Sequence, residues 1–159
     1  MTGPEELRAL VAELEEQERR LVFARFDNDD AWRLGSLIVS LAQERKLPVT
    51  VDIRRYGHQL FHAALPGTAP DNDRWIERKI RVVERFNAAS YLVGRRLAAA
   101  GRTLGPGEGI DPVDYAPHGG SFPVRITDVG VVGTVTVSGL PQGDDHALVV
   151  EALGTFLAG

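Results

Sequence analysis

Hydrophobic residues recur along the chain at the two spacings that distinguish amphipathic helices from half-buried strands. Apolar residues three or four positions apart predict four helices, which begin at or near Pro4, 27–30, 71–73 and 143–145. Acidic residues gather at each start, where the exposed N–H groups of a helix favour negative charge. The third helix is the longest, since the spacing continues from Ile76 to Leu97 and predicts one helix as far as Gly101.

Short segments rich in β-branched and aromatic residues predict five strands, at 20–26, 49–54, 58–63, 122–126 and 131–137. Turns at Tyr56-Gly57 and near Asp128 join the last four into two hairpins, which favours an antiparallel sheet. We therefore expect an α/β (α+β) fold with a five-stranded antiparallel sheet flanked by helices. At 159 residues the chain is long enough for one domain, over residues 1–159.

Composition narrows the class of protein. Hydrophobic residues make up 43% and charged residues 25%, as in ordinary globular domains, and the net charge of -4 gives no basic field for nucleic acid or membrane. The absence of cysteine excludes thiol chemistry and thiolate metal sites. The acidic N-terminus lacks a secretory pattern, and no apolar run approaches the ~20 residues of a membrane span. We expect a soluble cytoplasmic protein.

A long segment without helical or strand pattern, residues 102–120, ends in His118-Gly119-Gly120. Loops of this length in compact domains are usually functional or disordered. The two glycines permit close approach of a ligand or a partner chain to the backbone. His118 is therefore a candidate site residue, and the alternative is a plain turn from loop to strand.

His146 is the second candidate, in the first turn of the last predicted helix. The helix N-terminus disfavours a charged imidazole, whereas Asp144 and Asp145 favour one, so the sequence leaves the sign open. A neutral ring could bind a metal or haem iron; the alternative is a surface histidine near a helix cap. His58 and His62 lie roughly 13 Å apart along one strand and cannot chelate one ion together.

Several motifs fail their structural context. The stretch at 118–122 resembles an oxyanion-hole sequence, but the chain has no Gly-x-Ser-x-Gly nucleophile elbow. The glycines at 105–109 follow a helix rather than a strand, which argues against a dinucleotide loop. Residues 71–86 carry five positive and four negative side chains and predict a solvated helix face rather than a nucleic-acid grip.

Three blocks of sequence, at 61–79, 118–126 and 139–153, carry a resemblance that covers nearly the whole chain. In these blocks the chain resembles the GlcG/HbpS-like family, the haem-degrading domain family, in its branch of small single-domain proteins. The resemblance implies a profilin-like sandwich and a homo-oligomer, a dimer or larger. It also implies a link to haem binding or degradation, or to the handling of iron or cobalamin.

The resemblance makes His118 and His146 the natural site residues. The ligand-binding set that we predict is His118, Gly119, Gly120, Arg78 and Lys79. The predicted metal set is His118, His146 and Asp145, for a divalent ion such as zinc. For haem, we expect Tyr115, Pro117 and Phe122 to line an apolar slot beside the ligand.

Three functions follow from these candidates. The first is an oligomeric protein that binds haem, a related tetrapyrrole or a divalent metal through histidines. The second is an oligomeric scaffold or partner-binding protein without chemistry, with Trp75 as a contact anchor. The third is an enzyme acting on a carbonyl or hydroxy-acid substrate, although the sequence offers no evident general base. Approach of His118 and His146 to ~4–5 Å would favour a shared metal.

Overall fold

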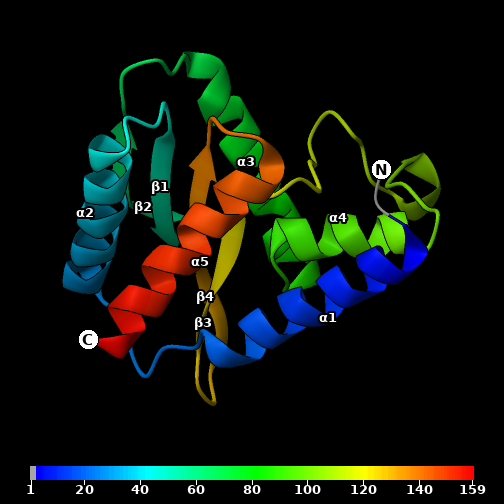
Figure 1. The fold of residues 1–159 in the computed structure, drawn as a ribbon, viewed down its shortest axis with the longest axis horizontal. Helices are drawn as coiled ribbons and strands as arrows, with labels where there is room; N and C mark the ends of the chain where they lie inside the picture. The colour runs from blue at the N-terminus through cyan, green and yellow to red at the C-terminus, as the bar shows by residue number, and fades with distance from the viewer. Residues whose placement is uncertain (1–2) are drawn as a thin grey trace.

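The computed structural model describes residues 3–159 (Figure 1), so the first two residues of the predicted domain lie outside the described part. Its helices and strands are α1 (Pro4–Arg20), α2 (Asn28–Glu44), β1 (Thr50–Arg55), β2 (His58–Ala64), α3 (Pro70–Phe86), α4 (Ser90–Ala99), the 3-10 turn η1 (Pro106–Glu108), β3 (Ser121–Ile126), β4 (Gly130–Ser138) and α5 (Gln142–Ala158). Between residues 3 and 159, no helix has the length and apolar character needed to cross a membrane.

Four strands form one antiparallel sheet in the order β2-β1-β4-β3. Both predicted hairpins are confirmed, as is a mixed fold with helices flanking an antiparallel sheet. The prediction of a fifth strand at 20–26 is wrong, because α1 extends to Arg20 and only Phe23 forms a single parallel bridge, with Ile126. The apolar side chains of Leu21, Phe23 and Phe26 are buried in the core instead. The profilin-like description remains a prediction.

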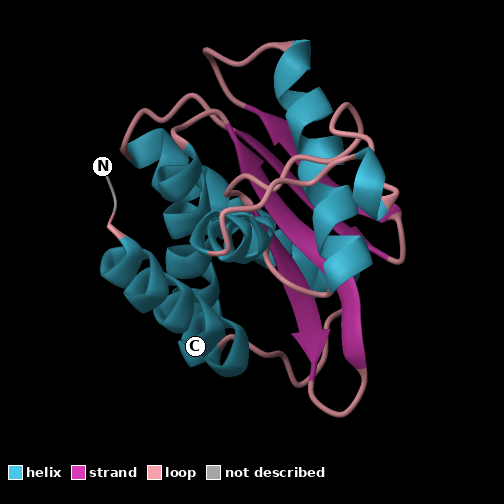
Figure 2. Ribbon diagram, turned by 90° about the vertical axis from the view of Figure 1, so that its right-hand side faces the viewer, coloured by secondary structure: helices cyan, strands magenta, loops and turns pink. Residues whose placement is uncertain are grey.

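Helices cover both faces of the sheet (Figure 2). On one face, Val51 pairs with Val137 and Ile53 with Val135, and these fully buried side chains pack beneath α2 and α5. The opposite face lies under α3 and is polar although it is buried: Thr50, Asp52, Thr134 and Thr136 are each at most 2% exposed.

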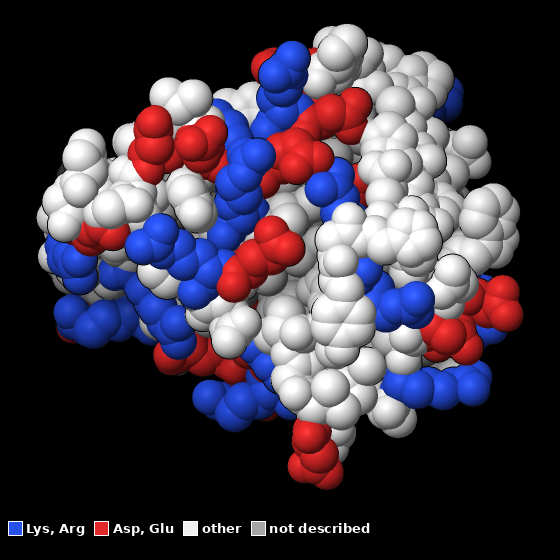
Figure 3. All heavy atoms as spheres, turned by 180° about the vertical axis from the view of Figure 1, so that it is seen from behind, with Lys and Arg blue, Asp and Glu red and all other residues white. Residues whose placement is uncertain are grey.

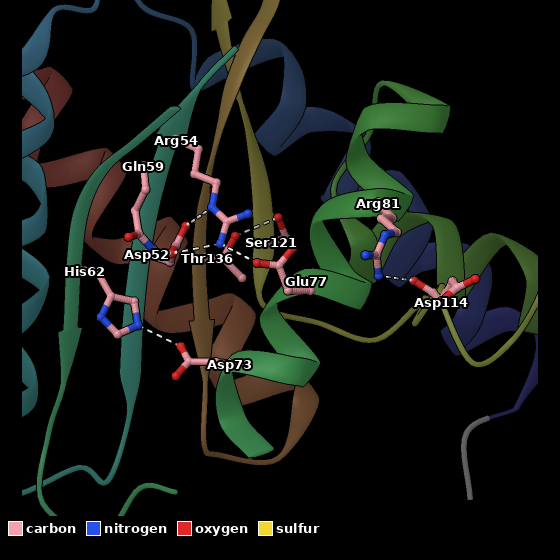
Figure 4. A network of polar contacts seen from close by, with 10 residues as sticks. All are labelled: Asp52, Arg54, Gln59, His62, Asp73, Glu77, Arg81, Asp114, Ser121 and Thr136. Atoms are coloured by element: carbon pink, nitrogen blue, oxygen red, sulfur yellow. Dashed lines mark hydrogen bonds and ion pairs between the residues drawn. The ribbon is translucent and has the colours of Figure 1, made fainter. Parts of the chain in front are cut away.

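Ion pairs join this polar face to α3 (Figure 4). The Asp52 carboxylate accepts hydrogen bonds from Arg54 Nε at 2.9 Å and from Gln59 Nε2 at 2.6 Å. Arg54 also donates to Glu77 on α3 at 2.6 Å, and His62 Nε2 lies 2.7 Å from Asp73 Oδ1. A buried carboxylate is tolerated here because charged and amide donors satisfy it.

The predicted long helix is two helices, α3 and α4, with a break at residues 87–89. Asn87 adopts a left-handed conformation, with φ of 53°, and ends α3. The buried carboxylate of Glu18 accepts a hydrogen bond from Ala89 N at 2.6 Å and forms an ion pair with Arg125 at 2.9 Å. The helical spacing continues across the break because both helices turn apolar side chains toward the interior. The hydrophobic pattern therefore could not reveal the break between α3 and α4.

Candidate functional site

A cavity of about 310 Å³ opens between α3, the end of the long loop, the end of β4 and the start of α5. Its lining residues are Asn72, Trp75, Lys79, His118, Ser138, Gly139, Leu140, Gln142 and Asp145. The fold thus brings together three of the predicted site residues, His118 from the loop, Lys79 from α3 and Asp145 from α5. We call this cavity the His118 pocket.

His118 lies at the exposed rim of the pocket. Its ring stands edge-on to Trp75, with the ring centroids 5.6 Å apart and the planes at 89°. Partial burial of the ring lowers the pKa of His118, and the positive charges of Arg78, Lys79 and Arg95 lower it further. The imidazole is therefore neutral at pH 7, with a lone pair on one ring nitrogen that can accept a proton or bind a metal.

Lys79 and Asp145 form a buried ion pair at the floor of the pocket. Lys79 Nζ donates to Asp145 Oδ2 at 3.1 Å and to the Val137 carbonyl at 3.1 Å. The residues are only 3% and 2% exposed. Burial lowers the pKa of Lys79 and raises the pKa of Asp145, and the attraction between the two charges opposes both changes. The backbone N–H groups of Gly139 and Leu140 also donate to Asp145, which favours the charged form of its carboxylate.

The two glycines after His118 permit close packing within the chain. A Cβ on Gly119 would lie 2.0 Å from the Gln142 carbonyl oxygen. Gly120 has a φ of 140°, and a Cβ there would lie 2.7 Å from Lys79 Nζ. The close approach expected at these glycines is therefore made by α5 and by the pocket floor. They shape the wall of the site, and a role in contacting a ligand stays a prediction.

We expect Gly120→Ala to lower the free energy of unfolding by about 1–3 kcal/mol, because the added methyl group overlaps the Val137 carbonyl oxygen and Lys79 Nζ and strains the backbone. Gly154→Ala, in the middle of α5 where a Cβ meets nothing within 4 Å, is the matched control. It should be neutral or stabilising by up to about 1 kcal/mol. Urea unfolding followed by circular dichroism measures both, and equal stabilities of the two variants would contradict the packing described here.

Arg78 lies beside the pocket rather than in its lining. Its guanidinium stacks over the ring of Trp75 at 4.5 Å and donates to the Pro112 carbonyl at 2.9 Å. The Nε atoms of Arg78 and Arg95 are buried and have no hydrogen-bond partner within residues 3–159. Elsewhere on the face covered by α3, positive and negative side chains interleave (Figure 3), in agreement with the balanced charge of residues 71–86.

His146 lies in the core, outside the lining of the pocket. It is 4% exposed, its ring packs against Tyr91 and Phe122, and its Nε2 lies 2.7 Å from Gln17 Oε1. Burial lowers the pKa of His146 to about 4, so the ring is neutral. The sequence left open whether the pKa of His146 is raised or lowered. Burial lowers it, and this effect outweighs the helix dipole and the neighbouring carboxylates.

The predicted metal set is not assembled. Among residues 3–159, no group of three or more histidine, aspartate or glutamate side chains is arranged to hold a metal ion. Asp145 is occupied by Lys79 and two backbone N–H groups, and His146 faces Gln17. These residues therefore serve packing and charge pairing in the described chain.

The apolar slot expected beside His118 is not formed by the predicted residues. Phe122 is 1% exposed and belongs to the core, and Tyr115 lies under the guanidinium of Arg85 at 5.8 Å. Five residues of the lining were not among the predicted site residues: Asn72, Ser138, Gly139, Leu140 and Gln142. Asn72 and Gln142 fall inside two of the sequence blocks that carry the family resemblance. Their place in these blocks is the one sequence signal that could have pointed to them as site residues.

Comparisons with known proteins agree on one family. A family model described as "Haem degrading protein HbpS-like" matches residues 26–154. The UPF0303 protein SCO2848 of Streptomyces coelicolor is 69% identical over 147 residues, which cover 92% of this chain and 93% of the relative. The crystal structure of the Ybr137w protein is similar with a TM-score of 0.86 and 31% identity, covering 98% of this chain and 96% of that chain. A crystal structure of a PduOC:heme complex has the same fold, with a TM-score of 0.68, 18% identity and coverage of 81% and 93%.

Proposed function

The chain belongs to the HbpS-like haem-degrading family, as the three sequence blocks predicted, and we propose that it binds an iron tetrapyrrole through His118. The observation that carries the proposal is the state of this imidazole. It is exposed at the rim of a pocket, its pKa is lowered so that it is neutral, and neither ring nitrogen has a hydrogen-bond partner within residues 3–159. A neutral imidazole nitrogen is the usual protein ligand of haem iron.

Two features beside His118, an aromatic ring and a group of arginines, suit such a ligand. Trp75 offers an aromatic surface at the rim, and the charges of Arg78 and Arg95 act on His118 and suit the carboxylates of a tetrapyrrole. Haem, when bound, would supply an iron that takes a nitrogen ligand. His118 would hold it, while the arginines would orient its acidic edge.

Two further considerations support a tetrapyrrole over a bare ion. No three-residue metal group exists among the described residues, so a ligand with its own metal suits a single histidine better. One of the structural neighbours is a haem complex. The homo-oligomer implied by the family resemblance remains a prediction, supported by exposed apolar side chains such as Trp32, which is 65% exposed beside Phe61.

Titration of the purified protein with haemin tests the proposal. We expect a saturable shift of the Soret absorbance, and His118→Ala should weaken the affinity for haemin by at least about tenfold, because the imidazole ligand is lost. His58→Ala removes an exposed histidine at the start of β2 and serves as the matched control, with unchanged binding expected. A wild-type protein without a Soret shift, or equal affinities in wild type and His118→Ala, would refute binding through His118.

A further inference from the structure

The hydrogen bonds of two amide side chains define what the His118 pocket presents to a ligand. Asn72 Oδ1 accepts a hydrogen bond from Ala69 N at 2.9 Å, and Gln142 Oε1 accepts one from Gly119 N at 3.1 Å. Since only the oxygen of an amide can accept from an N–H group, these bonds identify the oxygen and the nitrogen of each side-chain amide. In both amides the oxygen is therefore engaged within the chain, while the NH₂ group has no acceptor within residues 3–159.

Other groups in the lining are also free donors. The indole N–H of Trp75 can only donate, and it has no acceptor within residues 3–159. Lys79 Nζ carries three N–H bonds when charged, and two of them have acceptors, Val137 and Asp145. The hydroxyl of Ser138 adds a group that can donate or accept.

The oxygens of Asn72, Gln142 and Asp145 are, in contrast, already engaged within the chain, which leaves the ring nitrogen of His118 and the hydroxyl of Ser138 as the free side-chain acceptors of the lining. Both oxygens of Asp145 accept hydrogen bonds, from Lys79, Gly139 and Leu140. The first turn of α5 lies at the same wall and adds the positive end of a helix dipole. An excess of donors over free acceptors requires a ligand rich in acceptors, and a cavity of about 310 Å³ is at the small end of ligand sites.

We propose that the His118 pocket is a carboxylate-binding site, in which the NH₂ groups of Asn72 and Gln142 and the indole of Trp75 hold the oxygens. The carboxylate comes either from an acidic side arm of a tetrapyrrole or from a small free organic acid. The first source rests on the proposed function, and the second does not. Lys79, whose charge is paired with Asp145, contributes its remaining N–H group to the same lining.

Two nearly isosteric substitutions test this assignment. Gln142→Glu and Asn72→Asp retain the oxygens that accept from Gly119 N and Ala69 N but replace each NH₂ donor by a charged oxygen. Each also places an acid in the first turn of a helix, which favours folding. We expect each to weaken carboxylate binding by about tenfold or more, because a charge-assisted hydrogen bond becomes a repulsion. Gln43→Glu makes the same change of charge on the exposed face of α2 and should leave binding unchanged.

Three probes separate the two sources: succinate by calorimetry, and haemin and haemin dimethyl ester by absorbance. Haemin binding more tightly than its ester, with the difference lost in Gln142→Glu, would support the tetrapyrrole source. Succinate binding that Gln142→Glu abolishes, without haemin binding, would support the free acid and refute the proposed function alone. The carboxylate site would be overturned if haemin and its ester bind equally and succinate does not bind. It would also be overturned if haemin and its ester bind equally and both substitutions leave succinate binding intact. Circular dichroism confirms that each variant is folded.

Discussion

Lys79→Met should lower the free energy of unfolding by about 3–5 kcal/mol, the usual cost of leaving one member of a buried ion pair without its partner. Methionine fills similar space but cannot neutralise Asp145, which is 2% exposed. The carboxylate would keep its bonds from Gly139 and Leu140 and lose the only cation within hydrogen-bond distance among residues 3–159. Urea unfolding at pH 7, followed by far-ultraviolet circular dichroism, measures the loss.

The double variant Lys79→Met/Asp145→Asn is the control. Removal of both charges should restore part of the lost stability, because an asparagine oxygen can still accept from the Leu140 N–H group. A double variant that is no more stable than Lys79→Met would show that the charge of Asp145 is not the source of the cost. If Lys79→Met alone loses less than about 1 kcal/mol, the Lys79–Asp145 pair behaves as a solvent-exposed ion pair, because losses of that size are typical of surface pairs.

This ion pair also marks what the sequence could and could not predict about the site. Lys79 and Asp145 were both site candidates, one as a ligand contact and one as a metal ligand. Their pairing joins residues 66 positions apart, through α3 and α5, and no local pattern encodes it. The pocket donors Asn72 and Gln142 were missed for the same reason, because their role follows from which backbone N–H group occupies each amide oxygen.

For the sheet, too, the sequence predicted local features but not long-range packing. Alternation of apolar and polar residues correctly predicted β1 and its hairpin, since the period of two is a property of the strand itself. The alternation is typical of a half-buried strand, yet α3 covers the polar face of Thr50, Asp52 and Arg54, and Glu77 pairs with Arg54. Alternation separates the two faces of a strand, but whether the polar face meets water depends on where a distant helix packs.

Acidification should destabilise the protein through His146, by about 3 kcal/mol between pH 6.5 and pH 4. Burial lowers the pKa of this ring from 6.5 to about 4 in the folded state. Between these values the unfolded chain binds a proton that the folded chain does not, so the free energy of unfolding falls as the pH falls. The stability is fully present above pH 6.5 and is lost as the pH approaches about 4.

His146→Gln isolates this effect, because glutamine does not titrate and can still donate to Gln17, which lies 2.7 Å from the ring nitrogen. Carboxylates that titrate in the same range are common to both proteins and cancel in the difference between them. Urea unfolding at a series of pH values should therefore give a wild-type slope steeper by up to about 1.4 kcal/mol per pH unit. Parallel profiles would mean that the pKa of the ring is the same in the folded and the unfolded protein. That result would contradict its burial against Tyr91 and Phe122, where a cation has no carboxylate partner among residues 3–159.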